Sequence, residues 1–89
     1  MDRFTSQELN PILDLLDKFV RGDDRSLSLA GEIEVALDRA FPEDEAIQDV
    51  VLALASYRPG GGAFLYDEAA MIPKCKWVRE EIRRLLETT

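Results

Sequence analysis

In four segments of this chain, apolar residues recur at intervals of three and four positions, the spacing of one face of an α-helix. The four stripes are Leu9, Ile12, Leu13, Leu16, Phe19 and Val20; Leu29, Ala30, Ile33, Ala36, Leu37, Ala40 and Phe41; Ile47, Val50, Val51 and Leu54; and Met71, Cys75, Val78, Ile82 and Leu85. A chain of 89 residues can bury one hydrophobic core but not two. The sequence therefore predicts a single all-α domain over residues 1–89, a compact four-helix bundle-like fold.

Local signals place the predicted helices at about 5–21, 27–41, 43–57 and 67–87. The expected N-terminal caps are Thr5, Ser26 or Ser28, and Asp67. Pro11 and Pro73 each follow a predicted cap by six residues, and each removes a backbone donor. The first and last helices are therefore predicted to be either kinked or split at these prolines.

The third segment is apolar over most of its circumference. From Ala46 to Tyr57 its polar strip is narrow and contains Leu52. A helix of this kind is typical of the middle of a bundle, so we expect it to be the most buried helix, with the other three packed around it. Its β-branched pair leaves a strand as the alternative.

A glycine-rich loop at residues 58–66 separates the third and fourth predicted helices. Pro59 should end the third helix, and the three glycines at 60–62 permit a sharp turn with positive φ. In the structural interpretation, the aromatic side chains that follow pin this turn to the core. Two functional alternatives remain, an anion-binding nest of glycine amides and a recognition loop that exposes Phe64 and Tyr66 to a protein partner.

Trp77 does not share the apolar face of the last predicted helix. At about 100° per residue, it lies roughly 120° from the centre of the stripe that runs from Met71 to Leu85. It is predicted either to be covered by Phe64 and Leu65, or to be a partly exposed aromatic anchor. The residues that would surround such an anchor are Arg58, Tyr66 and Arg84.

The net charge of −7 lies in the middle of the chain. Residues 22–57 carry nine acidic and two basic residues, whereas the rest of the chain carries nine of each. Glu43, Asp44 and Glu45 suit the positive end of a helix dipole, which is their structural interpretation. As a surface, the acidic residues favour a basic protein partner. They disfavour nucleic acid, because phosphates require Lys and Arg at the contact.

Few residues here are suited to catalysis or metal binding. Histidine is absent and Cys75 is the single cysteine, so we expect no catalytic residue, no cofactor and no metal site. The position of Cys75 in an apolar stripe predicts a buried, inert thiol. The longest apolar run is too short to cross a membrane, and the lone cysteine and the absence of a secretion signal favour the cytoplasm.

These features together favour a small non-catalytic protein-interaction module, such as an inhibitor or an immunity-like binder of a basic protein. In size and charge the chain is similar to small acidic helical bacterial proteins that neutralise basic toxins, a similarity of composition only. The predicted partner-binding residues are Arg58, Phe64, Tyr66, Trp77, Arg84, Glu43, Asp44 and Glu45. The alternatives are a homo-oligomeric adaptor with Trp77 in a twofold interface, and a carboxylate-dependent enzyme.

Overall fold

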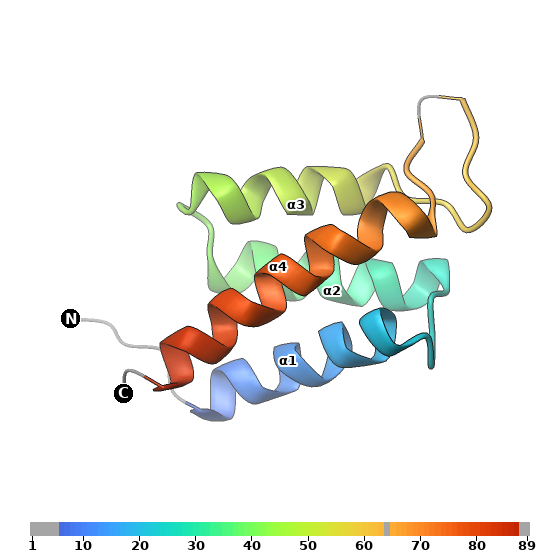
Figure 1. The fold of residues 1–89 in the computed structure, drawn as a ribbon. Coiled ribbons are helices and arrows are strands. Elements are labelled where there is room, and N and C mark those ends of the chain that lie inside the picture. The colour runs from blue at the N-terminus through green and yellow to red at the C-terminus, as the bar shows by residue number, and fades with distance from the viewer. Residues whose placement is uncertain (1–5, 64, 88–89) are drawn as a thin grey trace.

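A computed structural model describes residues 6–63 and 65–87 and shows four α-helices. They are α1 (Ser6–Arg21), α2 (Leu27–Ala40), α3 (Glu45–Ala55) and α4 (Glu68–Glu87). In Figure 1, α4 crosses the bundle diagonally, from the C-terminal end of α3 to the N-terminal end of α1. The predicted all-α four-helix bundle-like fold is confirmed.

Three helices begin at side-chain caps, each accepting a hydrogen bond from a backbone N–H three residues later. Ser26 accepts from Leu29 at 3.1 Å, Asp44 from Ile47 at 3.0 Å, and Asp67 from Ala70 at 2.9 Å. Ser26 and Asp67 were predicted as caps, and of the two serines considered it is Ser26 that serves. The predicted cap Thr5 lies outside the described residues.

The third helix is shorter than the predicted 43–57. It begins at Glu45 because Asp44 is its cap, and a capping residue has non-helical backbone geometry. It ends at Ala55, because the chain is then held by backbone pairing between Tyr57 and Tyr66.

Neither proline splits its helix. Pro11 and Pro73 each occupy the sixth position of a continuous helix, so each removes only a bond to a carbonyl of the first turn. Those carbonyls belong to Gln7 and Ala69, which are both exposed, and water can satisfy them.

The apolar stripes meet in one core to which all four helices contribute. Its most buried members, each no more than 1% exposed, are Leu9, Leu16, Phe19, Ala30, Ile33, Leu37, Met71, Cys75, Val78 and Ile82. Leu85 departs from its predicted stripe and is 37% exposed. It lies in the last part of α4, the end that Figure 1 shows away from α3.

α3 has five buried residues among its eleven, the largest share of the four helices, but it is not the centre of the bundle. It packs against α2 and α4, while α1 packs against the same two helices and not against α3. The prediction that three helices gather around the third is therefore wrong. The apolar pattern of a helix predicts how much of its surface is buried, but not how many helices bury it. Two neighbours cover one side of α3, while Leu52 on the other side stays 67% exposed.

Candidate functional site

The outer side of α3 carries an exposed apolar residue next to carboxylates. We call Glu45, Asp49 and Leu52 the α3 strip; all three are exposed, and their spacing places them on one face of the helix. Leu52 is the most exposed of the large apolar side chains that the structure describes. Acidic residues beside an exposed apolar side chain are the surface chemistry expected of a site for a basic protein.

The acids of α2 and α3 are not neutralised by the chain itself. Within residues 6–63 and 65–87, every ion pair involves α1, α4 or Asp23, and none reaches an acid between residues 32 and 49. Of the predicted residues in this region, Glu43 and Glu45 are exposed. Asp44 has a structural role, because one of its carboxylate oxygens accepts the hydrogen bond from Ile47 N–H that caps α3.

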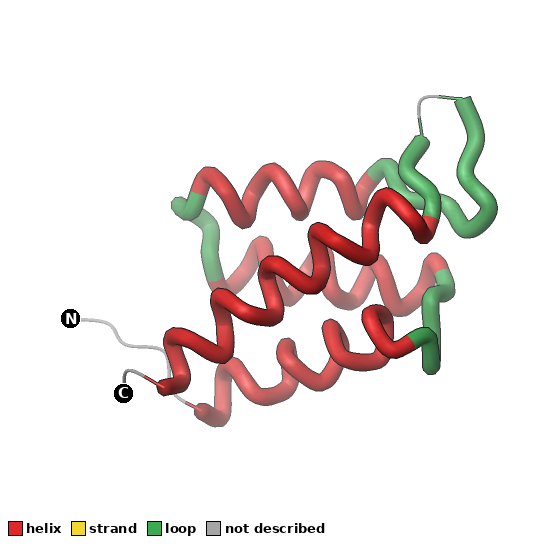
Figure 2. The backbone as a smooth tube through the Cα atoms, viewed as in Figure 1, coloured by secondary structure: helices red, strands yellow, loops and turns green. Residues whose placement is uncertain are grey.

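The described residues of the glycine-rich loop form a turn, part of the long connection between α3 and α4 in Figure 2. The Arg58 N–H donates to the Tyr66 carbonyl at 2.9 Å, and the Tyr66 N–H donates to the Ser56 carbonyl at 3.0 Å. Gly60 and Gly61 have φ values of 83° and 76°, which side-chain-bearing residues rarely adopt. The glycines therefore serve the turn, as the structural interpretation predicted.

The chain's own carboxylate already occupies part of the loop's potential anion nest. The Gly60 N–H donates to Glu68 Oε1 at 3.0 Å. This hydrogen bond holds the pKa of Glu68 below its usual value. An external phosphate would have to displace Glu68, so the loop offers a poor anion site.

The predicted aromatic and basic residues do not form one patch. Trp77 is 41% exposed, which agrees with its partly exposed alternative, and Tyr66 is 38% exposed with Lys74 Nζ 5.5 Å from its ring centre. Arg84 instead pairs with Glu81 at 3.3 Å. Arg84 lies ten residues beyond Lys74, the residue that contacts Tyr66, which is about 15 Å along α4. Arg84 and Tyr66 therefore do not converge on Trp77.

Arg58 is exposed, and Phe64 lies outside the described residues. The acids at 43–45 lie at the N-terminal end of α3 and the loop at its C-terminal end, about 16 Å apart for a helix of eleven residues. The predicted acids thus lie at the opposite end of α3 from Arg58 and Tyr66.

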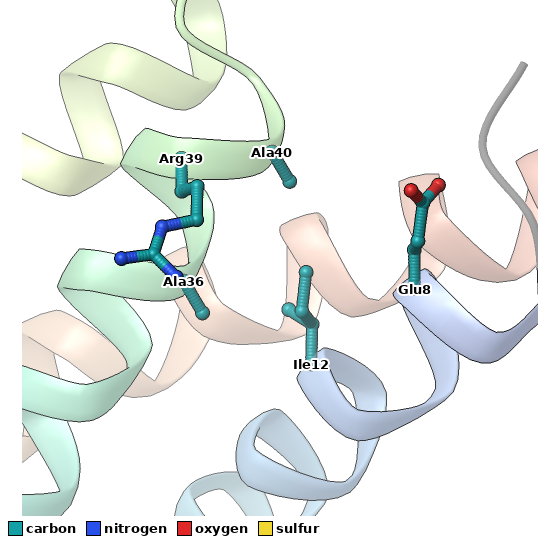
Figure 3. Close-up of a pocket in the computed structure, with 5 residues that line it drawn as sticks. All are labelled: Glu8, Ile12, Ala36, Arg39 and Ala40. Atoms are coloured by element: carbon teal, nitrogen blue, oxygen red, sulfur yellow. The ribbon is translucent and has the colours of Figure 1, made fainter.

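A groove between α1 and α2 was not predicted. One hollow of about 360 Å³ is lined by Glu8, Ile12, Ala36, Arg39 and Ala40, and Figure 3 shows Ile12 and the two alanines pointing toward the same space. A second of about 560 Å³ is lined by Leu15, Ser28, Gly31, Glu32, Val35, Ala36 and Arg39. Because the hollows share Ala36 and Arg39, we treat them as one α1–α2 groove. The sequence signals for this groove were Gly31 and the exposed Val35, but the sequence alone does not show which helix packs beside them.

The groups best suited to nucleophilic chemistry are withdrawn from solvent. Cys75 is fully buried, and burial raises the pKa of its thiol from 9.0 to about 12. The Tyr57 hydroxyl donates to the Arg25 carbonyl at 2.6 Å, and burial raises its pKa too. The described residues contain no cluster of three potential metal ligands. Nor is any described helix long and apolar enough to span a membrane.

No protein-family model, curated protein or solved structure matches this chain. What supports a function is therefore the chemistry of the molecular surface.

Proposed function

We propose that this chain is a non-catalytic protein-interaction module that binds a basic protein through the α3 strip, as an inhibitor or immunity-like partner would. The observation that carries the proposal is Leu52, which is 67% exposed and lies one turn beyond Asp49 and two turns beyond Glu45 on the same face of α3. Burying an apolar side chain supplies affinity, while unpaired carboxylates steer and orient a cationic partner.

The rest of the molecule supports binding over catalysis. The Cys75 thiol is buried and stays protonated at neutral pH, so it is a poor nucleophile. The excess of negative charge opposes contact with nucleic acid, and a single cysteine fits a reducing compartment such as the cytoplasm.

The test is affinity capture from the source cell with matched charge variants. Glu45→Lys combined with Asp49→Lys reverses the α3 strip, and Asp14→Lys combined with Glu87→Lys makes the same change in net charge on α1 and α4. We expect the wild-type chain and the α1–α4 variant to retain a basic protein at low salt. The α3 variant should retain less, and high salt should release the partner from all of them.

Two results would contradict the proposal. One is that nothing is retained above background at low salt. The other is that capture is insensitive either to high salt or to reversal of the α3 strip, since the carboxylates of the strip would then not be what binds the partner. Circular dichroism melts of each variant would establish that the fold is kept.

A further inference from the structure

We propose that the α1–α2 groove is the interface of a homodimer, in which the α2 helices of two copies pack antiparallel across a twofold axis. The axis passes between Val35 and Ala36, and Glu32 of each copy pairs with Arg39 of the other. This surface lies on α2, away from the α3 strip, so the inference does not depend on the proposed function.

The groove offers apolar area and room for a second helix. Val35 is 57% exposed, and Leu15 of α1 and Ala36 line the same hollow. A Cβ placed on Gly31 would meet nothing within 4 Å, so the backbone of α2 is open to close approach there. Small residues at a helix surface let a partner helix approach closely, and covering Val35 and Leu15 would remove apolar surface from water.

The groove also carries one unpaired acid and one unpaired base. Glu32 and Arg39 both line it, both are exposed, and neither has an ion pair or side-chain hydrogen bond within the described part of the chain. The other base of residues 22–57, Arg25, is already bound to carbonyls of α1. Of the two basic side chains in residues 22–57, Arg39 is thus the one that remains available for an ion pair with a partner.

The order of these residues is self-complementary. Glu32 and Arg39 lie on one helix face seven positions apart, about 10 Å along the axis, so they are too distant to pair within one helix. They are equally far from the point between Val35 and Ala36. Reversing the helix about that point brings Glu32 level with Arg39 of the second copy, and twofold symmetry makes the ion pair twice. Because the charges of this surface are complementary to those of the same surface rotated by a twofold axis, the occupant of the groove that fits best is a second copy of the chain.

The inference is tested by sedimentation equilibrium at near-physiological salt, where repulsion between the two acidic copies is screened beyond about 8 Å. We expect the wild-type chain to show a monomer–dimer equilibrium in the micromolar range or above. Glu32→Arg and Arg39→Glu each turn two attractive pairs into two repulsive ones, so each alone should weaken the dimer by about tenfold or more.

Charge exchange makes the test specific. An equimolar mixture of the Glu32→Arg and Arg39→Glu chains should form a heterodimer, because both contacts are again between opposite charges. The double variant Glu32→Arg with Arg39→Glu should form a homodimer for the same reason. Val35→Arg should abolish the dimer, whereas the matched control Leu52→Arg on α3 should leave it intact.

A strict monomer at hundreds of micromolar would overturn the inference. A dimer that neither charge reversal weakens would also overturn it. If Trp77→Ala abolished the dimer instead, the interface would lie on α4. If the mixture of reversed chains fails to associate although the wild-type chain dimerises, the proposed pairing of Glu32 with Arg39 is wrong. Far-ultraviolet circular dichroism of every variant excludes unfolding as the cause.

Discussion

At the scale of single residues, Arg25 and Tyr57 join parts of the chain that are distant in sequence. The Arg25 guanidinium donates to the carbonyls of Phe19 and Val20, at 2.7 and 2.8 Å, where a cation is favourable at the C-terminal end of α1. The Arg25 carbonyl accepts the Tyr57 hydroxyl, and the Tyr57 ring packs edge-on against Phe19, with centroids 5.3 Å apart. Tyr57 thereby ties the end of α3 to the connection between α1 and α2.

Leu54 and Trp77 should differ sharply in their contribution to stability. Leu54 is 2% exposed in the core, and Leu54→Ala should lower the free energy of unfolding by about 2 to 5 kcal/mol. Trp77 is 41% exposed, so Trp77→Ala should cost less, about 1 to 2 kcal/mol. Urea denaturation of both variants measures the difference, and equal costs would mean that Trp77 is covered in solution.

Cys75 should make the protein sensitive to alkali. Its pKa rises from 9.0 to about 12 on folding, so the folded state favours the protonated thiol. This contribution is complete below pH 9 and is lost as the pH rises toward 12, at up to about 1.4 kcal/mol per pH unit. Tyr57 acts in the same direction at higher pH, because its pKa is also raised.

The check is denaturant unfolding at a series of pH values from 8 to 10, in which the thiol of the unfolded chain titrates and tyrosine, whose usual pKa is about 10, titrates only at the upper end. Cys75→Ala should be less stable than the wild-type chain at pH 8 but should lose less stability by pH 10. A wild-type chain whose stability is constant across this window would show that the thiol is not shielded.

At the scale of elements, the glycines have opposite roles in the loop and in α2. Gly61 has a φ of 76°, and a Cβ added there would lie 3.1 Å from Asp67 Cβ. Gly60 has a φ of 83° with open space around its position. Gly31 lies in α2 with neither constraint, so within a single chain glycine at this position weakens the helix.

Alanine at these three positions should therefore give three different changes in stability. Gly31→Ala should raise the free energy of unfolding by up to about 1 kcal/mol. Gly60→Ala should lower it by about 1 to 2 kcal/mol, the cost of left-handed geometry. Gly61→Ala should cost more than Gly60→Ala, because it adds a close contact. Thermal or urea melts at low protein concentration rank the three, and a different order would contradict the loop geometry described above.

The elements were predictable where their determinants are local. The caps at Ser26 and Asp67 depend on residues three positions away, and the buried stripes depend on helical period, so both could be predicted from the sequence. The neighbours of α3 could not, because amphipathic pattern does not specify which helices provide the cover. The Gly60 bond to Glu68 and the α1–α2 groove were missed for the same reason, since each requires knowledge of which segments meet.

At the scale of the whole molecule, an ion pair joins the first helix to the last. Arg79 of α4 donates to Asp17 of α1 at 3.1 Å, across 62 positions of sequence, and their side chains are only 14% and 24% exposed. The Nε atom of Arg79 is buried without a hydrogen-bond partner. The pair of Arg21 with Asp23 has a similar length but joins neighbouring residues and is 64% and 59% exposed.

Removing one member of the Asp17–Arg79 pair should therefore cost more than removing one member of the exposed pair. Asp17→Ala leaves the largely buried Arg79 guanidinium with only the longer, exposed pair to Glu80 at 3.9 Å, so the free energy of unfolding should fall by about 1 to 3 kcal/mol. Asp23→Ala should change it by less than about 0.5 kcal/mol, because solvent screens the exposed pair. Replacing both members, Asp17→Leu with Arg79→Met, should recover much of the loss, since no buried charge remains and the side chains still fill the space between α1 and α4. Urea denaturation of the three variants decides the matter: equal effects of Asp17→Ala and Asp23→Ala would mean that apolar packing alone closes the bundle.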